Sequence, residues 1–244
     1  MATKKTYICN KINYNLRIDG DLTKPEWALA SKDSLVDTIT AKSPRQSTEI
    51  KLLWNDEFLY AAFDCEDTYI FATMSEFNDS LWMEEVVEIF IDPAGTQTKY
   101  LEFNINPLNT HLHYQLTVKQ NGIRQDGTDN ELIFARTEDV LKSAIRINKT
   151  TNRWQAEIAI PLIELSDMPH YPPQPGDKIN INLYRIDRAK SPDIHASPLH
   201  ECKSADVIQE DEYTAWSPTY ALQYHCLDKF GTLIFHDKIR KEFT

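Results

Sequence analysis

The sequence has few glycines, few cysteines and a deficit of positive charge. Only 6 of its 244 residues are glycine, and it contains neither a glycine-rich phosphate loop nor a nucleophile elbow. With 26 Lys and Arg against 37 Asp and Glu, the formal net charge is −11. Nucleic acid is therefore not an expected partner, because its phosphates require a basic surface. Neutral ligands or cations are favoured instead.

Long hydrophobic runs are missing as well. The lysines near the N-terminus are not followed by the apolar segment of a signal peptide, and no stretch is long enough to span a membrane. We therefore expect no membrane partner. The missing signal predicts a cytoplasmic protein, whereas an extracellular location is expected if the chain is a mature or truncated form. The sequence thus leaves the compartment open.

Cysteine pairs with a metal-binding or redox spacing do not occur. The four cysteines are Cys9, Cys65, Cys202 and Cys226, and none forms a CxxC motif. Four cysteines can pair in three ways, so their spacing does not decide their redox state. We expect free thiols because the export signal that accompanies most disulfide proteins is missing.

Helical periodicity is rare, and short segments of alternating polarity take its place. Residues 49–54 and 58–64 flank one polar turn, and residues 141–147 and 153–160 flank another, which is typical of β-hairpins. A hydrophobic content of 41% is sufficient for a full core. We predict one all-β domain over residues 1–244, an antiparallel, jelly-roll-like β-sandwich.

Three predicted strands carry polar side chains on the face opposite to their apolar residues. Val87, Ile89 and Ile91 share one face of the first strand, so Glu88 points away from the apolar layer. The second and third strands repeat this alternation. Their outward polar residues are Glu102, Asn104 and Asn106 in the second strand and Asn182 in the third.

If these strands pair, their carboxylates and amides converge on one sheet face beside Trp82. This tryptophan precedes the first strand, next to Asp79 and Ser80, where a loop would present it at the sheet edge. Carboxylates and amides take sugar hydroxyls in pairs, and an indole offers a flat apolar plate to a pyranose ring. The pattern therefore favours a saccharide site. The tryptophans expected in the core are Trp27, Trp54, Trp154 and Trp216.

Five blocks of residues occur in an order that spans almost the whole chain. They are Ile18-Asp19-Gly20-Asp21 followed by Trp27, residues 52–60, residues 82–92, residues 154–161, and Ala215-Trp216-Ser217-Pro218-Thr219 through Phe230-Gly231. In this order they resemble the family 9 carbohydrate-binding modules, β-sandwiches first recognised beside xylanase catalytic domains. The resemblance implies binding without turnover.

The resemblance also implies a sugar held between two aromatic plates. Trp82 falls on the first plate, and Glu88 falls on a hydrogen-bonding acid. Tyr224 falls where the family usually has a tryptophan as its second plate, and Asn104 falls where some members carry arginine. A structural calcium ion is a further implication of the resemblance, and no other cofactor is expected.

We therefore predict a non-catalytic protein that binds the end of a glucan-type or xylan-type oligosaccharide or polysaccharide. A glycoside hydrolase acting in trans is an expected partner, because an isolated module has no catalytic domain to serve. The expected ligand-binding residues are Trp82, Glu88, Glu102, Asn104, Asn106, Asn182 and Tyr224.

Two alternative functions stay open. Glu85 and Glu88, with Glu84 beside them, would suit a glycoside-processing enzyme, since such enzymes place two carboxyl groups about the scissile bond. A haem-binding or protein-interaction sandwich would use the same fold with other loops, because a fold does not determine a function.

Metal ligands give only weak patterns. Residues 64–67 and 126–131 offer the oxygen ligands that calcium prefers, but neither has the spacing of an EF-hand loop. A zinc site would require His and Cys residues from separate segments to meet. The residues concerned are His111 and His113 on one strand face, and His200-x-Cys202 with His225-Cys226.

Overall fold

The computed structural model describes residues 4–118, 131–189, 198–201 and 210–237. The elements of one half are β1 (Thr6–Lys11), η1 (Pro25–Ala28), β2 (Lys32–Ser34), β3 (Val36–Asp37), β4 (Thr48–Trp54), β5 (Phe58–Glu66), β6 (Tyr69–Ile70), η2 (Leu81–Met83), β7 (Val86–Asp92), β8 (Lys99–Ile105) and β9 (His111–Val118). Those of the other half are β10 (Glu131–Ala135), β11 (Lys142–Asn148), β12 (Arg153–Pro161), η3 (Leu162–Leu165), β13 (Lys178–Asp187), β14 (His200–Glu201), β15 (Glu212–Ala215), η4 (Leu227–Lys229) and β16 (Gly231–His236). The η elements are short 3-10 helices.

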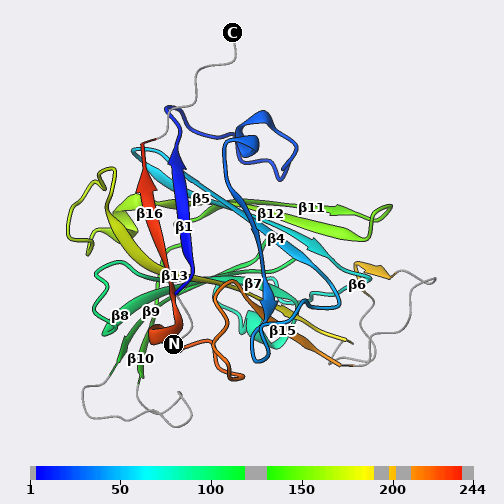
Figure 1. Cartoon of the computed structure of the whole chain (residues 1–244). Helices are drawn as coiled ribbons and strands as arrows, with labels where there is room; N and C mark the ends of the chain where they lie inside the picture. Colours follow the sequence, from blue (N-terminus) through cyan, green and yellow to red (C-terminus); the bar gives the residue numbers. More distant parts are fainter. Residues whose placement is uncertain (1–3, 119–130, 190–197, 202–209, 238–244) are drawn as a thin grey trace.

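One long sheet curls into two facing layers (Figure 1). The first layer has the order β10-β9-β8-β7-β13, with β15 also paired to β13, and the second has the order β1-β4-β5-β12-β11. Strand β16 joins the layers because it pairs with β13 and with β1. The predicted β-sandwich is confirmed. Its long ladders are antiparallel except those of β1, which runs parallel to both β16 and β4.

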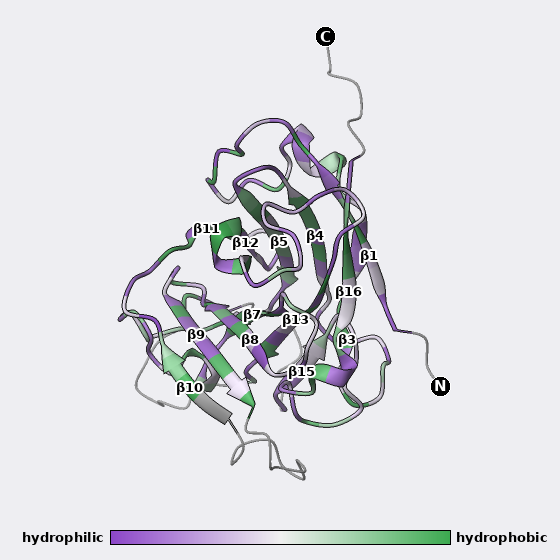
Figure 2. Cartoon of the chain, turned by 90° about the vertical axis from the view of Figure 1, so that its left-hand side faces the viewer, coloured by the Kyte–Doolittle hydropathy of each residue, from purple (hydrophilic) through white to green (hydrophobic). Residues whose placement is uncertain are grey.

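The main core lies between the two layers. It is built by the inward residues of the alternating strands, so Val87, Ile89 and Ile91 of β7 pack with side chains of β4, β5 and β12. Figure 2 shows the alternation as purple and green bands along β8 and β9. The predicted inward faces of β7, β8 and β13 are therefore confirmed. The predicted core tryptophans, Trp27, Trp54, Trp154 and Trp216, are all fully buried.

The hairpins that the sequence predicts are present. Strands β4 and β5 pair around a turn in which the Asn55 side-chain oxygen accepts hydrogen bonds from the backbone N–H groups of Glu57 and Phe58. Strands β11 and β12 form the second hairpin. No helix among the described residues is long and apolar enough to cross a membrane.

The outer face of β7, β8 and β13 is also covered, which the alternation alone does not predict. Phe90, Tyr100 and Tyr184 pack there with Leu227 and Phe230 from the segment between β15 and β16. The polar residues of these strands point away from the main core, as predicted, but they lie under a second apolar cluster. Their carboxyl groups therefore titrate in a poorly solvated environment, and their amide groups form hydrogen bonds in the same environment.

Candidate functional site

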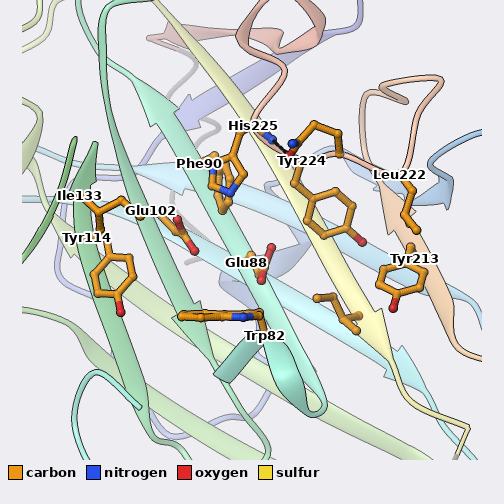
Figure 3. A pocket seen from close by; sticks show the side chains of 12 residues that line it. Trp82, Glu88, Phe90, Glu102, Tyr114, Ile133, Tyr213, Leu222, Tyr224 and His225 are labelled. Atoms are coloured by element: carbon orange, nitrogen blue, oxygen red, sulfur yellow. Dashed lines mark hydrogen bonds between the residues drawn. The ribbon is translucent and has the colours of Figure 1, made fainter. Parts of the chain in front are cut away.

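A cavity of about 400 Å³ opens on this outer face, above β7 and β8 (Figure 3). Its floor comes from β7 and β8, and its walls come from η2, β9, β15 and the segment before η4. Most of its lining is aromatic or aliphatic. The lining residues are Trp82, Glu88, Phe90, Glu102, Tyr114, Ile133, Ile186, Tyr213, Leu222, Gln223, Tyr224 and His225.

Trp82 lies in η2 at the edge of the sheet, where the sequence predicts it. Its side chain is 38% exposed, in contrast to the other four tryptophans. The indole lies 6.2 Å from the ring of Tyr114, centroid to centroid, on strand β9. In Figure 3 the indole is seen edge-on as one wall of the cavity. An exposed indole in this position can stack on a flat apolar ligand face.

Glu88 and Glu102 lie on the cavity floor on adjacent strands. Glu88 is opposite Asn104 in the register of β7 and β8, and the Asn104 amide donates to Oε1 of Glu102 at 2.9 Å and to Oε1 of Glu88 at 3.3 Å. The two glutamates are 2% and 5% exposed. The second oxygen of Glu88 has no hydrogen-bond partner among the described residues. One amide therefore holds two carboxyl groups side by side.

Burial makes these two carboxyl groups weak acids. Desolvation raises the pKa of Glu88 well above its ordinary value and the nearby Glu102 raises it further, while the positive charge of Arg188 acts against them. Desolvation likewise raises the pKa of Glu102 to about 7, although the Asn104 hydrogen bond lowers it. The pair therefore retains a proton near neutral pH, so it can both donate and accept hydrogen bonds.

Arg188 connects two walls of the cavity from behind. Its Nη2 donates to the backbone oxygen of Trp82 at 2.6 Å. Its Nη1 donates to Asp211 Oδ2 at 2.6 Å and to the Tyr213 hydroxyl at 2.8 Å. The guanidinium also lies 5.6 Å from the centroid of the Tyr213 ring. Arg188 is thus a positioning residue for both aromatic walls, and the sequence analysis missed it.

Tyr224 lines the cavity but is not the free second plate that the resemblance implies. Its ring stacks on Tyr184 with centroids 4.1 Å apart and planes 13° apart, so one face is already covered. Its hydroxyl donates to the backbone oxygen of Arg185 at 2.9 Å. Figure 3 shows this ring turned toward the viewer while Trp82 is edge-on, so the two rings do not face each other.

Asn106 and Asn182 do not line the cavity, and their expected role as ligand contacts stays a prediction. The Asn106 amide donates to the backbone oxygen of Met74, and its oxygen accepts from the backbone N–H of Thr110. The Asn182 amide donates to the backbone oxygen of Ser217 at 2.8 Å, and the Asn182 side-chain oxygen accepts from the backbone N–H of Ser217. Loops cover both asparagines, and the loop backbone takes their hydrogen bonds. Asn104 also lies outside the lining and acts through the two glutamates.

Several lining residues were missed by sequence reasoning. Tyr114 is opposite Glu102 in the register of β8 and β9, so a strand predicted over residues 111–118 would have placed it on the same face as Glu102. His225 follows Tyr224 directly, and its Nδ1 lies 2.6 Å from the hydroxyl of Tyr100. No local pattern indicates Tyr213, because the approach of β15 to β13 is a tertiary feature.

Glu85 and Glu84 do not accompany Glu88 in the cavity. Glu85 is fully buried and accepts from the backbone N–H of Arg188. Glu84 accepts from the backbone N–H groups of Thr73 and Met74. The expected acid and nucleophile pair for glycoside hydrolysis, Glu85 with Glu88, therefore does not share one site.

A buried cluster of three acids is the strongest metal candidate among the described residues. Carboxylate oxygens of Asp67, Glu85 and Asp187 lie within 4.8 Å of one another. The guanidinium of Arg185 lies among them, with Nη2 at 2.8 Å from Asp67 and at 3.1 Å from Asp187. Calcium takes six to eight oxygen ligands. The cluster fits calcium poorly, because a protein cation and backbone N–H donors already hold several of its oxygens.

The described side chains of the other metal candidates contact separate protein groups and do not converge on one point. Asp64 pairs with Arg153 at 2.7 Å, and Glu66 accepts from the Ser47 hydroxyl. Residues 126–130 and Cys202 lie outside the described residues. Three of the remaining described side chains have hydrogen-bond partners: His111 contacts Asp139 and Ser143, His200 contacts Asn152 and His225 contacts Tyr100. The ring of His113 packs on Phe103, and its nitrogens have no hydrogen-bond partner among the described residues. Cys9 and Cys65 are buried free thiols. Calcium binding stays a prediction.

A β-sandwich whose outer sheet face carries an aromatic cavity with buried carboxyl groups is a ligand-binding module by its architecture. The chain belongs to the carbohydrate family 9 binding domain-like family, whose model matches residues 18–238. Its function is therefore carbohydrate binding, and the resemblance described from the sequence blocks is confirmed.

The chain is also similar to a relative in sequence and to solved structures in fold. An extracellular protein of Arthroderma benhamiae is 28% identical over 205 residues, which cover 81% of this chain and 82% of that protein. A Bacteroides uniformis protein to which carbohydrate binding has been ascribed superposes with a TM-score of 0.69 at 17% identity, covering 96% of this chain and 100% of the other. A family 9 carbohydrate-binding module of Caldicellulosiruptor kristjanssonii in complex with glucose gives a TM-score of 0.60 at 14% identity, covering 98% and 99%. These structural likenesses concern the fold.

Proposed function

We propose that this protein binds the end of a glucan-type or xylan-type chain in the cavity beside Trp82, without turnover. The observation that carries the proposal is the exposed Trp82 indole at the wall of a cavity whose floor holds Glu88 and Glu102. The indole stacks on the apolar face of a sugar ring, and the two carboxyl groups take hydroxyls.

The size of the cavity and the ligands of similar folds support this proposal. A volume of about 400 Å³ lies within the range of about 300 to 1,000 Å³ that small-molecule sites occupy. Solved family 9 modules from Caldicellulosiruptor kristjanssonii hold glucose in one structure and cellotriose in another. We propose a glycoside hydrolase as the partner in trans, because a binding module of this kind concentrates an enzyme on its substrate.

The experiment that tests the proposal compares Trp82→Ala with Tyr14→Ala. Both replace an exposed aromatic side chain, but only Trp82 lines the cavity. In calorimetric titrations with glucose, xylose and cellotriose, we expect Trp82→Ala to weaken binding at least tenfold and Tyr14→Ala to bind as the wild type does. Because Trp82 is partly exposed, Trp82→Ala should lower the free energy of unfolding by much less than the roughly 3 to 5 kcal/mol expected for a buried tryptophan.

Intrinsic fluorescence gives a second measurement. Sugar should shift the tryptophan emission of the wild type, because the other four tryptophans are fully buried and only Trp82 meets the ligand. The shift should be absent in Trp82→Ala. If no saccharide in the panel perturbs the emission or the melting temperature of the wild type, the cavity is not a saccharide site.

A further inference from the structure

Among the described residues that line it, the cavity has acidic groups and no lysine or arginine to balance them. Glu88 and Glu102 lie on its floor, and none of the residues that line it is a lysine or an arginine. His225, at the rim, shares its Nδ1 with the hydroxyl of Tyr100. A ligand that enters the cavity therefore meets two carboxyl groups and, within the part of the chain that the structure describes, no lysine or arginine beside them.

The nearest cation is engaged outside the cavity. Arg188 is the positive charge that acts on Glu88, but its Nη1 forms a 2.6 Å ion pair with Asp211, and its Nη2 donates to the backbone oxygen of Trp82. Its charge is thus largely neutralised where it lies. Arg188 stabilises the walls of the cavity, and its charge only partly offsets the acidic charge of the floor.

Glu88 also presents an unused acceptor. Its Oε2 is buried and has no hydrogen-bond partner among the described residues, while Oε1 shares the single amide of Asn104 with Glu102. A buried oxygen of this kind is costly to leave without a partner, and a charged donor compensates it best. A cationic donor would therefore find an acceptor without a partner at one atom of the floor, Glu88 Oε2.

The walls favour a cation as well. The rings of Trp82, Tyr114 and Tyr213 line the cavity, and the faces of aromatic rings carry negative potential that attracts cations. An ammonium group between these rings and the floor is thus attracted by both. The same rings still offer apolar contact to the carbon skeleton of a sugar.

We propose that the cavity prefers a saccharide end that carries a protonated amino group, of the glucosamine type, over its neutral counterpart. The ammonium group would donate to Glu88 Oε2 and lie against Glu102, while the ring stacks on Trp82. This inference rests on the proposed saccharide function and specifies the chemistry of its ligand. Ammonium binding favours the ionised form of the carboxyl pair, so it releases the proton that the free pair retains.

The test is a calorimetric titration of the whole chain with glucosamine, N-acetylglucosamine and glucose at about pH 7, below the ordinary pKa of about 8 for an α-amino group. The three probes share one ring and differ in the substituent at one carbon, which is charged only in glucosamine. We expect glucosamine to bind at least about tenfold tighter than glucose, which corresponds to about 1.4 kcal/mol. N-acetylglucosamine should not share this advantage, because its amide is uncharged.

Two variants and one further measurement decide between outcomes. In Glu88→Gln the ratio of glucosamine to glucose affinity should fall toward one, whereas the exposed acid variant Glu76→Gln should retain the wild-type ratio. Titration in buffers of different ionisation enthalpy should show proton release from the wild type with glucosamine and none with glucose. This measurement needs no variant, so it holds even if Glu88→Gln does not fold.

Contrary results separate this inference from the proposed function. Glucose binding as tightly as glucosamine, or glucosamine binding without proton release, overturns the amino-sugar preference and leaves the saccharide site intact. An affinity ratio unchanged in Glu88→Gln also overturns it. Failure of all three sugars and of cellotriose to bind removes the proposed function and this inference together.

Discussion

Glu102 is a single residue whose burial should make folding depend on pH. Its pKa is raised from 4.5 to about 7. An acid with a higher pKa in the folded state stabilises the fold below its unfolded pKa, and this contribution is lost as the pH rises through its folded pKa. Between pH 4.5 and pH 7, the free energy of unfolding should therefore fall by up to about 3 kcal/mol through this group.

Urea unfolding of the wild type and of Glu102→Gln at several pH values measures this effect. The glutamine variant should lose less stability than the wild type across that interval, because an amide does not titrate. The Glu76→Gln control should follow the wild type, since Glu76 is exposed. Parallel curves for the wild type and Glu102→Gln would show that Glu102 titrates normally.

Tyr224 is the residue at which the structure reverses an expectation from the family pattern. An indole offers more stacking area than a phenol, which favours tryptophan at a free plate. Here the ring lies on Tyr184 and is only 9% exposed. We expect Tyr224→Trp to lower stability by about 1 to 3 kcal/mol through overpacking and to leave sugar affinity no better. Thermal unfolding and calorimetric titration check both parts, and a tighter-binding, equally stable variant would contradict them.

At the scale of elements, strand β16 begins at a glycine because Trp216 lies against it. A Cβ added to Gly231 would lie 2.2 Å from Cζ3 of Trp216 and 3.0 Å from the backbone oxygen of Lys5. Strand β16 pairs with both β1 and β13, so its backbone has little freedom to move away. The close approach therefore excludes any side chain at this position.

We expect Gly231→Ala to lower the free energy of unfolding by about 1 to 3 kcal/mol, as overpacking of a buried site does. The double variant Gly231→Ala with Trp216→Phe should recover part of this loss relative to Trp216→Phe alone, because a smaller ring makes room for the methyl group. Denaturant unfolding measures both. Full stability of the single variant would mean that Trp216 can move away without cost.

At the scale of the whole molecule, Arg185 holds the two layers together through buried polar contacts. It extends from β13 to the second layer, where Nη1 donates to Thr48 and to the backbone oxygen of Glu66. Its Nη2 pairs with Asp67 and with Asp187. Removing the cation would leave buried carboxyl groups without compensation.

We therefore expect Arg185→Met to lower stability by about 3 to 5 kcal/mol, the usual result of removing one partner from a buried ion pair. The loss should be smaller below pH 6, because burial raises the pKa of Asp187 to about 6 and a protonated carboxyl needs no cation. Arg153→Met is the matched control. Its pair with Asp64 is partly exposed and should contribute about 1 kcal/mol or less. Equal losses in urea unfolding would contradict this difference.

Local alternation of polar and apolar residues was enough to predict the sandwich and the direction of most side chains. A period of two assigns Val87, Ile89 and Ile91 to the core and Glu88 to the opposite face, because successive residues of a strand point to opposite sides. The position of Trp82 just before its strand likewise predicted an exposed indole at the sheet edge. These properties are local, so a local pattern specifies them.

What covers the polar face, and which groups meet there, depends on contacts between segments that are distant in the sequence. The segment before β16 folds over β7 and β13, stacks Tyr224 on Tyr184 and encloses Asn182, while β9 brings Tyr114 to Glu102. The approach of β15 brings Tyr213 to Arg188 in the same way. Alternation fixes the face to which a side chain points, but it does not encode which distant segment lies on that face. For this reason the face to which Glu88 points was predictable from the sequence, whereas the burial of Glu88 and its raised pKa were not.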